Sequence, residues 1–276
     1  MRSAEFAKKL VNGSTGLYTW RKAFSATATI ANTWLDLSMA GGWPGINYWA
    51  GDPLTAREMD SKYALRNNAA PASRAQNYAT EIGFLAPLAG MKYLLVDVLT
   101  FYPFIDMDST EYQVFDNTTP LPRFAGGNEV LPFMVLTTVN AGGGAFTYDY
   151  INCDGIAATS PTITCTAGVV NAAHLVTTTP FLPLASGCRG VRSITGLQQS
   201  IVNGNGAGSL ACIVLCRPIK LFDARDLNRW TVNEAVLTGI PAKWREDAKL
   251  SLLCVNGASQ ASTIHHGYIQ SIWEAP

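Results

Sequence analysis

The chain has 276 residues, of which 48% are hydrophobic and only 14% are charged, and its 20 basic side chains balance its 20 acidic ones. This length suits one large β domain or two small ones. A charge-poor surface with zero net charge argues against nucleic acid or an anionic membrane as the main partner. It fits a protein that associates with other protein, because little charge repulsion keeps its copies apart.

The first 80 residues predict an extended N-terminal arm, followed by a second domain over residues 81–276. Residues 3–11 have the pattern of one short helix, and residues 26–37 that of a strand rich in Thr. Residues 55–78 are polar and poor in aliphatic side chains. We expect them to lie on another surface.

An aromatic loop interrupts this arm at residues 39–54, MAGGWPGINYWAGDPL. Its glycines and prolines predict a structured loop and no regular element. Trp43, Tyr48 and Trp49 are therefore our interface candidates, since aromatic side chains anchor protein contacts. A sugar-stacking platform is a further interpretation, but packing within the chain or against another subunit is favoured.

Residues 92–108, KYLLVDVLTFYPFIDMD, predict the central strand of the fold. Both faces of this strand are apolar, and only Asp97 interrupts them, which is typical of a strand covered on both sides. Pro103 cannot donate to a sheet ladder and marks the end of central pairing. The run is too short and too interrupted to cross a bilayer, which needs about 20 apolar residues.

The rest of the chain predicts β-strands joined by glycine-rich and asparagine-rich turns. Three hairpins are expected, at residues 131–151, 191–222 and 249–273. The expected fold class is all-β: an antiparallel β-sandwich of the jelly-roll type, with the N-terminal arm attached.

The densest acidic cluster holds Asp106, Asp108 and Glu111. A Ca²⁺ loop or the paired carboxylates of a glycosidase are possible interpretations. We favour a turn whose side chains cap backbone amides, because the further ligands and the glycine of an EF-hand loop are absent.

Other chemical motifs are weak. The glycines of residues 204–208 precede a strand instead of a helix, which excludes a dinucleotide loop. The three histidines, His174, His265 and His266, belong to no zinc pattern, and the chain has no G-x-S-x-G motif. We therefore expect no catalytic residue, no cofactor and no metal site.

All six cysteines fall in the second half of the chain. No secretion signal is visible, so reduced and buried thiols are expected. Cys212 and Cys216 share one face of a strand, where a free thiol acts as a small apolar group. Cys153 and Cys165 flank a turn-rich segment and are the pair most able to meet.

Four segments together carry a resemblance to a known class of proteins. They are WLDLSMAGGWPGINYWAGDPL (34–54), KYLLVDVLTFYPFIDMDSTE (92–111), FLPLASGCRGVRSITGLQ (181–198) and GYIQSIWE (267–274). This combination resembles virion structural proteins of tailed bacteriophages, and in particular those that decorate or cement the capsid.

The resemblance implies a jelly roll on the outside of the head that bridges capsomers through its N-terminal portion. The implied partners are the major capsid protein and further copies of this chain, with a trimer favoured. It implies synthesis in the host cytoplasm, no enzyme activity and no cofactor. A carbohydrate-binding or receptor-binding head-fibre or tail component remains an alternative. So does a glycan-cleaving enzyme that uses Asp106 and Asp108.

Overall fold

The structure is a computed structural model. It describes residues 15–23, 30–43, 45, 47–60, 64–65, 76–136, 143–166, 175–202, 208–224, 226, 230–234, 242–245, 247–259 and 264–273. These residues form β-strands and one short 3₁₀ helix, η1 (Leu37–Met39). The predicted helix at residues 3–11 lies outside the described residues. Of the predicted strand at 26–37, only Trp34–Asp36 is a strand in the described part.

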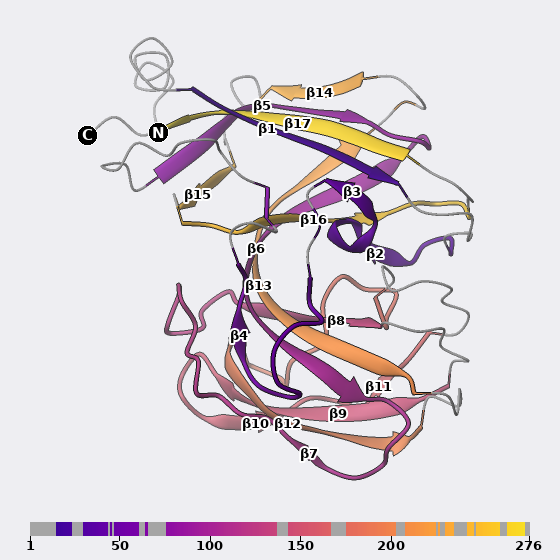
Figure 1. Ribbon diagram of the computed structural model, residues 1–276, viewed down its shortest axis with the longest axis vertical. Coiled ribbons are helices and arrows are strands. Elements are labelled where there is room, and N and C mark those ends of the chain that lie inside the picture. The colour runs from indigo at the N-terminus through magenta and orange to yellow at the C-terminus, as the bar shows by residue number, and fades with distance from the viewer. Residues whose placement is uncertain are drawn as a thin grey trace.

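Three antiparallel sheets make up the molecule (Figure 1). The outer sheet has the order β14 (Trp230–Glu234), β5 (Gln76–Leu85), β17 (Ile264–Trp273), β1 (Thr15–Ala23) and β3 (Gly41–Trp43), and β15 (Lys243–Arg245) also pairs with β5. The central sheet has the order β2 (Trp34–Asp36), β16 (Leu250–Val255), β6 (Met91–Asp106), β13 (Leu210–Ala224) and β8 (Leu131–Leu136), with β4 (Arg57–Glu58) on β6. The insertion sheet has the order β10 (Ala157–Thr159), β9 (Ala145–Asn152), β12 (Val191–Ile201) and β7 (Gln113–Val114), with β11 (Ile163–Thr164) on β9.

Eight strands of the outer and central sheets form a jelly roll. Taken along the chain, they pair first with last and then inward: β1 with β17, β2 with β16, β5 with β14, and β6 with β13. This is one long antiparallel ribbon rolled so that its pairs alternate between two sheets, which is the topology of a jelly roll. The predicted fold class, an antiparallel β-sandwich of this type, is confirmed.

The tip of that ribbon carries a large insertion. Between β6 and β13, residues 107–209 hold β7 to β12 and so form the insertion sheet and β8. The two ribbon strands span 16 and 15 residues. Figure 1 shows them running from the outer-sheet end of the molecule to the insertion-sheet end. Each of these two strands therefore packs against the outer sheet over one part of its length and against the insertion sheet over another.

One face of the central sheet supplies the core of the jelly roll. Tyr93 and Leu95 of β6 point toward the outer sheet and pack with Trp20 and Phe84. The rings of Phe84 and Tyr93 are stacked with centroids 4.4 Å apart. Alternation along β6 dictates this arrangement, because residues two apart share a face.

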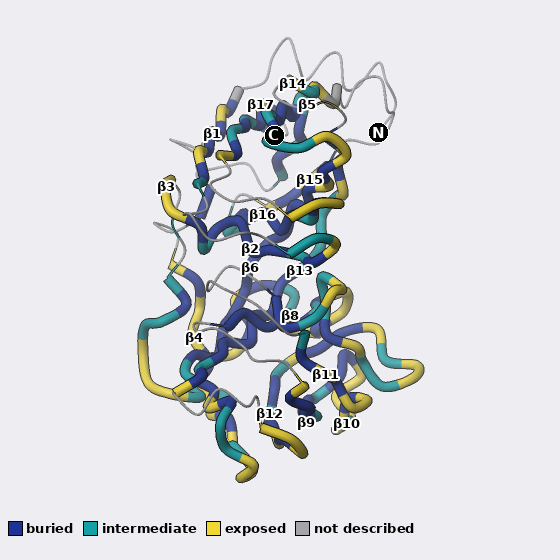
Figure 2. The backbone as a smooth tube through the Cα atoms, turned by 90° about the vertical axis from the view of Figure 1, so that its right-hand side faces the viewer, coloured by how far each residue is buried: buried dark blue, intermediate teal, exposed yellow. Residues whose placement is uncertain are grey.

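Farther along the same face, β6 supplies the core of the insertion. Leu99 and Tyr102 pack there with Phe146 and Tyr148 of β9. Figure 2 shows buried positions continuing through β6 and β13 across the middle of the molecule.

The opposite face of the central sheet is also covered. Leu94, Val96 and Val98 pack there with Tyr48 and Met59, which come from the segment between β3 and β6. Both faces of β6 are therefore buried, as the sequence pattern predicted.

The division of the chain near residue 80 stays a prediction. In the structure, β5 runs through residue 80 without a break. The earlier strands β1 to β4 pair with β17, β16 and β6, which come from much later in the chain. The described part of the N-terminal region is thus built into the jelly roll.

Candidate interaction surface

The outer sheet has one face in the core and one face in solvent. Along β1, Tyr18 and Trp20 are buried, whereas Leu17 and Arg21 are exposed. The same alternation holds in β17, where Ile269 is buried and its neighbours on each side are not.

The strand register assembles an aromatic row on the solvent face. Trp43 lies opposite Arg21, Arg21 opposite His266, His266 opposite Leu85, and Leu85 opposite Trp230. The row thus crosses five neighbouring strands and ends in a tryptophan on each side. Trp43 and Trp230 are 58% and 51% exposed, which is unusual for side chains of this size.

Tyr268 lies beside this row, and its ring rests on the sheet over Gly83, which has no side chain. A Cβ atom at Gly83 would come within 2.3 Å of the Tyr268 ring, so the ring lies directly over this position. The rings of Tyr268 and Trp230 are 5.3 Å apart between centroids. The Tyr268 hydroxyl donates to the Glu81 carboxylate. Burial first, and Glu81 second, raise the pKa of Tyr268 to about 12.

We call this surface the aromatic face. It consists of Trp43, Leu85, Trp230, Val232 and Tyr268. Trp43, Trp230 and Val232 are exposed, Leu85 and Tyr268 are partly exposed, and Arg21 and His266 lie between Trp43 and the others. Exposed apolar side chains on one surface mark sites of interaction, and Trp and Tyr are favoured there. Flat ring faces beside polar side chains suit either a protein surface or a sugar ring.

Of the three aromatic side chains predicted from sequence, the structure brings only Trp43 to the aromatic face. Tyr48 is fully buried on the far side of the central sheet, where its hydroxyl donates to Asp36 Oδ2 at 2.9 Å. Its ring packs edge-on against Phe101 at 5.6 Å. Trp49 is half-buried with its ring 5.9 Å from that of Phe104. Tyr48 therefore packs within the chain, which is one of the interpretations that the sequence left open.

Sequence reasoning missed Trp230 and Tyr268. Their only signals were a tryptophan in a polar segment and the alternation of the last strand. Neither reveals that β14 and β17 flank β5, and hence that the two rings meet over Gly83.

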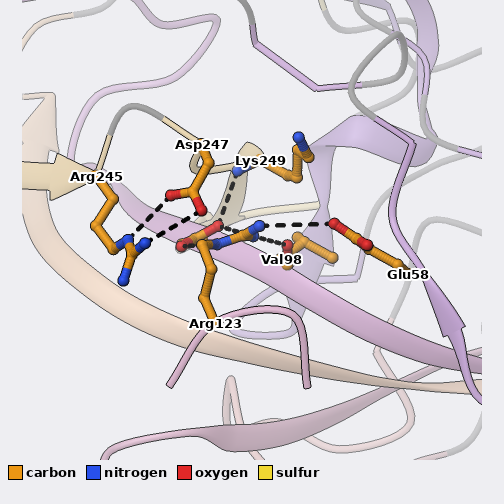
Figure 3. A network of polar contacts seen from close by, with 7 residues as sticks. Glu58, Val98, Arg123, Arg245, Asp247 and Lys249 are labelled. Carbon is orange, nitrogen blue, oxygen red and sulfur yellow. Dashed lines mark hydrogen bonds and ion pairs between the residues drawn. The ribbon is translucent and has the colours of Figure 1, made fainter. Parts of the chain in front are cut away.

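A second notable group lies inside the molecule, where the two cores meet (Figure 3). Arg123 donates from Nη2 to Asp97 Oδ1 at 2.7 Å and from Nε to Asp97 Oδ2 at 3.1 Å. Its Nη2 also donates to the Val98 carbonyl at 2.9 Å, and the Lys249 N–H donates to Asp97 Oδ1 at 2.8 Å. Glu58 lies 3.9 Å from Arg123 Nη1. Both carboxylate oxygens of Asp97 accept hydrogen bonds from protein donors, which makes this group structural.

A third buried group closes the corner between the outer and central sheets. Lys22 Nζ donates to the carbonyls of Ser38 at 2.8 Å and Ala40 at 3.2 Å. Burial lowers the pKa of Lys22 to about 8, although the nearby Asp36 opposes that shift. Burial raises the pKa of Asp36, against the hydrogen bonds that it accepts from Ser38 and Tyr48.

The acidic cluster forms a capping turn, as expected. Asp108 Oδ2 accepts from the N–H groups of Gly208 at 2.9 Å and Ser209 at 2.8 Å, and Asp106 Oδ1 accepts from the Asp108 N–H. No three His, Cys, Asp or Glu side chains among the described residues are placed together as metal ligands.

The histidines and cysteines complete the account of predicted sites. His265 is buried with Nδ1 2.9 Å from the Tyr93 hydroxyl, while His174 lies outside the described residues. All six cysteines are free, and five of them, all except Cys188, are buried. Burial raises the pKa of the Cys165 thiol to about 12. Within the described ranges, no helix has the length and apolar character to cross a membrane.

The topology and the aromatic face define this chain as a jelly-roll protein with a sheet inserted at the ribbon tip. No known protein family model matches the chain, and no curated protein matches it. Solved structures with some similarity include a subviral particle of VP2 from infectious bursal disease virus, at 9% identity and a TM-score of 0.19. That match covers 95% of this chain and 81% of the other.

The Gx strain of the same virus matches at 10% identity, with a TM-score of 0.18 and coverage of 94% and 81%. Similarity this low supports no conclusion about function. The strand pairing above defines the fold.

Proposed function

We propose that this chain is a non-enzymatic structural protein of a tailed-phage virion and that it decorates or cements the capsid. One observation carries the proposal: the jelly roll presents an aromatic face to solvent. Such a face suits a partner surface better than bulk water. The resemblance of residues 34–54 and 92–111 to phage capsid-decorating proteins supports the same assignment.

In this proposal the aromatic face contacts the head, and the major capsid protein is the partner. Trp43 and Trp230 are the anchors at the two sides of the face. Tyr48 and Trp49 pack on the far face of the central sheet and take no part in this contact. The outer sheet then faces the particle, and the insertion sheet, at the opposite end of the molecule, points away from it (Figure 1).

The proposal includes self-association. With zero net charge and an exposed aromatic face, copies of the chain should meet without strong repulsion. We propose a closed homo-oligomer, a trimer in preference, on the capsid surface. The protein would be made in the host cytoplasm, and neither nucleic acid nor membrane would be a partner. Sedimentation of the purified protein over a range of concentrations tests this part.

The decisive experiment measures binding to undecorated heads. Trp43→Ala and Trp230→Ala should each weaken binding by about tenfold or more, since truncated aromatic anchors commonly cost 2 kcal/mol or more. Val114→Ala is the matched control, because Val114 is 69% exposed on the insertion sheet, away from the aromatic face. Equal binding by all three variants would contradict the proposal. So would absence of the protein from purified particles analysed by mass spectrometry.

A carbohydrate-binding or receptor-binding head-fibre or tail component is the second candidate function. The Trp230–Tyr268 ring pair beside the Glu81 carboxylate favours it, since aromatic faces stack on sugar rings and carboxylates bind hydroxyls. Titration with host-surface oligosaccharides distinguishes the two functions. Binding that Trp230→Ala abolishes, without any binding to heads, would support this alternative.

The N-terminal region cannot be tested by deletion. Removal of residues 1–79 would delete β1 to β4 and the start of β5, which pair with the later strands β17, β16, β6 and β15. Point variants on the aromatic face are therefore the appropriate test of how the protein holds its partner.

A further inference from the structure

A small cavity lies inside the jelly roll, where the outer and central sheets face each other. Trp20 and Lys22 of β1 line it from the outer sheet, Ser251 of β16 lines it from the central sheet, and Ser38 of η1 lines it from the corner between them. Its other walls are four leucine residues. Trp20, Lys22 and Ser251 are only 4%, 2% and 3% exposed. These walls therefore belong to the interior of the protein.

The cavity walls carry buried polar groups that lack partners. Trp20 Nε1 and the Ser251 hydroxyl have no hydrogen-bond partner among the described residues. Lys22 Nζ carries three N–H donors, and the described residues offer it two acceptors, the carbonyls of Ser38 and Ala40. A buried donor without an acceptor destabilises the folded state, and native proteins rarely leave one unpaired. Because these side chains line the same cavity, one ligand there can serve them together.

The size and chemistry of the cavity select a water molecule. The space open to the centre of a water-sized sphere is about 10 Å³, close to the roughly 10–15 Å³ that one water needs. A larger ligand has no room. Trp20 and Lys22 supply donors, and the Ser251 hydroxyl supplies a donor and an acceptor. A buried water typically makes about two to four hydrogen bonds to such groups.

We propose that this cavity binds one structural water molecule, which accepts hydrogen bonds from Trp20 Nε1 and Lys22 Nζ and donates one to the Ser251 hydroxyl. The water would join β1 of the outer sheet to β16 of the central sheet. It would also complete the three hydrogen bonds of the Lys22 ammonium group. The site is thus an internal bridge between the two sheets of the jelly roll.

This bridge lies behind the strand that presents Trp43. Lys22 donates to the Ala40 carbonyl, directly before β3, and lies opposite Gly42 in the pairing of β1 with β3. A water that holds the Lys22 ammonium group in place therefore also holds the start of β3. This consequence for Trp43 rests on the proposed function, in which Trp43 is an anchor, whereas the water site itself does not depend on it.

A high-resolution crystal structure of the full chain tests the proposal. It should show one isolated peak of electron density in the cavity, about 2.7–3.2 Å from both Trp20 Nε1 and Lys22 Nζ. Crystals soaked in NaBr separate water from a halide ion, because bromide scatters anomalously and water does not. No peak, or a peak with a bromide signal, would overturn the proposal. Neither measurement involves heads, so its failure is distinct from failure of the proposed function.

Nuclear magnetic resonance tests the same site in solution. The indole N–H of Trp20, identified by its loss in Trp20→Phe, should give a nuclear Overhauser cross-peak with a long-lived water. Ser251→Ala should keep this cross-peak, which excludes a signal relayed by the serine hydroxyl.

Lys22→Met removes the charged donor and should abolish the cross-peak, because a cavity with mostly apolar walls stays dry. Thr19→Ala, on the exposed face of the same strand, is the matched control and should keep it. An unchanged cross-peak in Lys22→Met, or none in the wild type, would overturn the proposal. Where Lys22→Met fails to fold, the wild-type spectrum and crystal structure decide the question.

Discussion

Asp97 and Arg123 form a bidentate ion pair at the point where the two cores of the molecule meet. On the face of β6 that supplies both cores, Asp97 lies between Leu95 of the jelly-roll core and Leu99 of the insertion core. Arg123 comes from the loop between β7 and β8, within the insertion. The insertion is therefore bonded to the central strand of the jelly roll from inside, with both side chains almost fully buried.

Arg123→Met should destabilise the protein by about 3–5 kcal/mol, because it leaves the Asp97 carboxylate buried without its cation. Urea denaturation measures the change in the free energy of unfolding. Arg245→Ala is the control, since the Arg245–Asp247 pair nearby is about half exposed and should contribute about 1 kcal/mol or less. Equal losses in the two variants would show that the buried pair does not hold the cores together.

Lys22 should make stability depend on pH in the alkaline range. Its pKa is about 8 in the folded protein and 10.5 as an ordinary lysine, so between these values the unfolded chain binds more protons. The contribution of Lys22 to the free energy of unfolding should therefore rise as pH increases from 8 to 10.5, by on the order of a few kcal/mol. The buried thiols, whose pKa burial raises, lower the stability of any variant above pH 9, so the contribution of Lys22 is measured as the difference between the wild type and Lys22→Met. Chemical denaturation of both proteins at several pH values gives this difference, and a difference that does not change with pH would refute the assignment.

His265 should make stability depend on pH in the acidic range. Burial, and secondarily the charge of His266, lower its pKa from 6.5 to about 3. Below pH 6.5 the unfolded chain takes up a proton that the folded protein does not. Stability should therefore fall between pH 6.5 and pH 3, by on the order of 4 kcal/mol. His265→Gln should lose this dependence, whereas His266→Gln, on the solvent side of β17, should keep it. Loss of the dependence in both variants, or in neither, would contradict the role given to His265.

The central strand could be predicted from sequence because its pattern is local. Alternating apolar residues on both faces of residues 92–108 require cover on both sides, and the structure provides it. The all-β class followed from the strand lengths in the same way. The three hairpins expected at residues 131–151, 191–222 and 249–273 are wrong, because β8 and β9, β12 and β13, and β16 and β17 lie in different sheets. The insertion could not be predicted, because nothing local shows that β6 and β13 pair across the 103 residues of 107–209.

The candidate surface was predicted only in part, for a related reason. Trp43 ends β3 and Tyr48 comes five residues later, yet the fold exposes the first and buries the second. Which side of a sheet an aromatic residue occupies depends on register with strands far along the chain. The meeting of Trp230 with Tyr268 depends on β5, which pairs with both of their strands.

Gly83 offers a way to disturb the aromatic face without removing any of its side chains. In Gly83→Ala, the added Cβ would lie 2.3 Å from the Tyr268 ring, so the ring must lift from the sheet. Its contact with Trp230 and its hydrogen bond to Glu81 should then be lost. Alanine is tolerated in a strand, so the fold should remain, with a stability loss of about 1 kcal/mol.

The expected result for Gly83→Ala is binding to undecorated heads that is at least about tenfold weaker, because disturbed aromatic anchors carry much of an interface's energy. Cosedimentation with heads measures it, and tryptophan fluorescence reports the altered surroundings of Trp230. Gly126→Ala is the matched control, since a Cβ there meets no atom within 4 Å. Wild-type binding by Gly83→Ala, together with an altered Trp230 signal, would place the contact with the head on another surface of the protein.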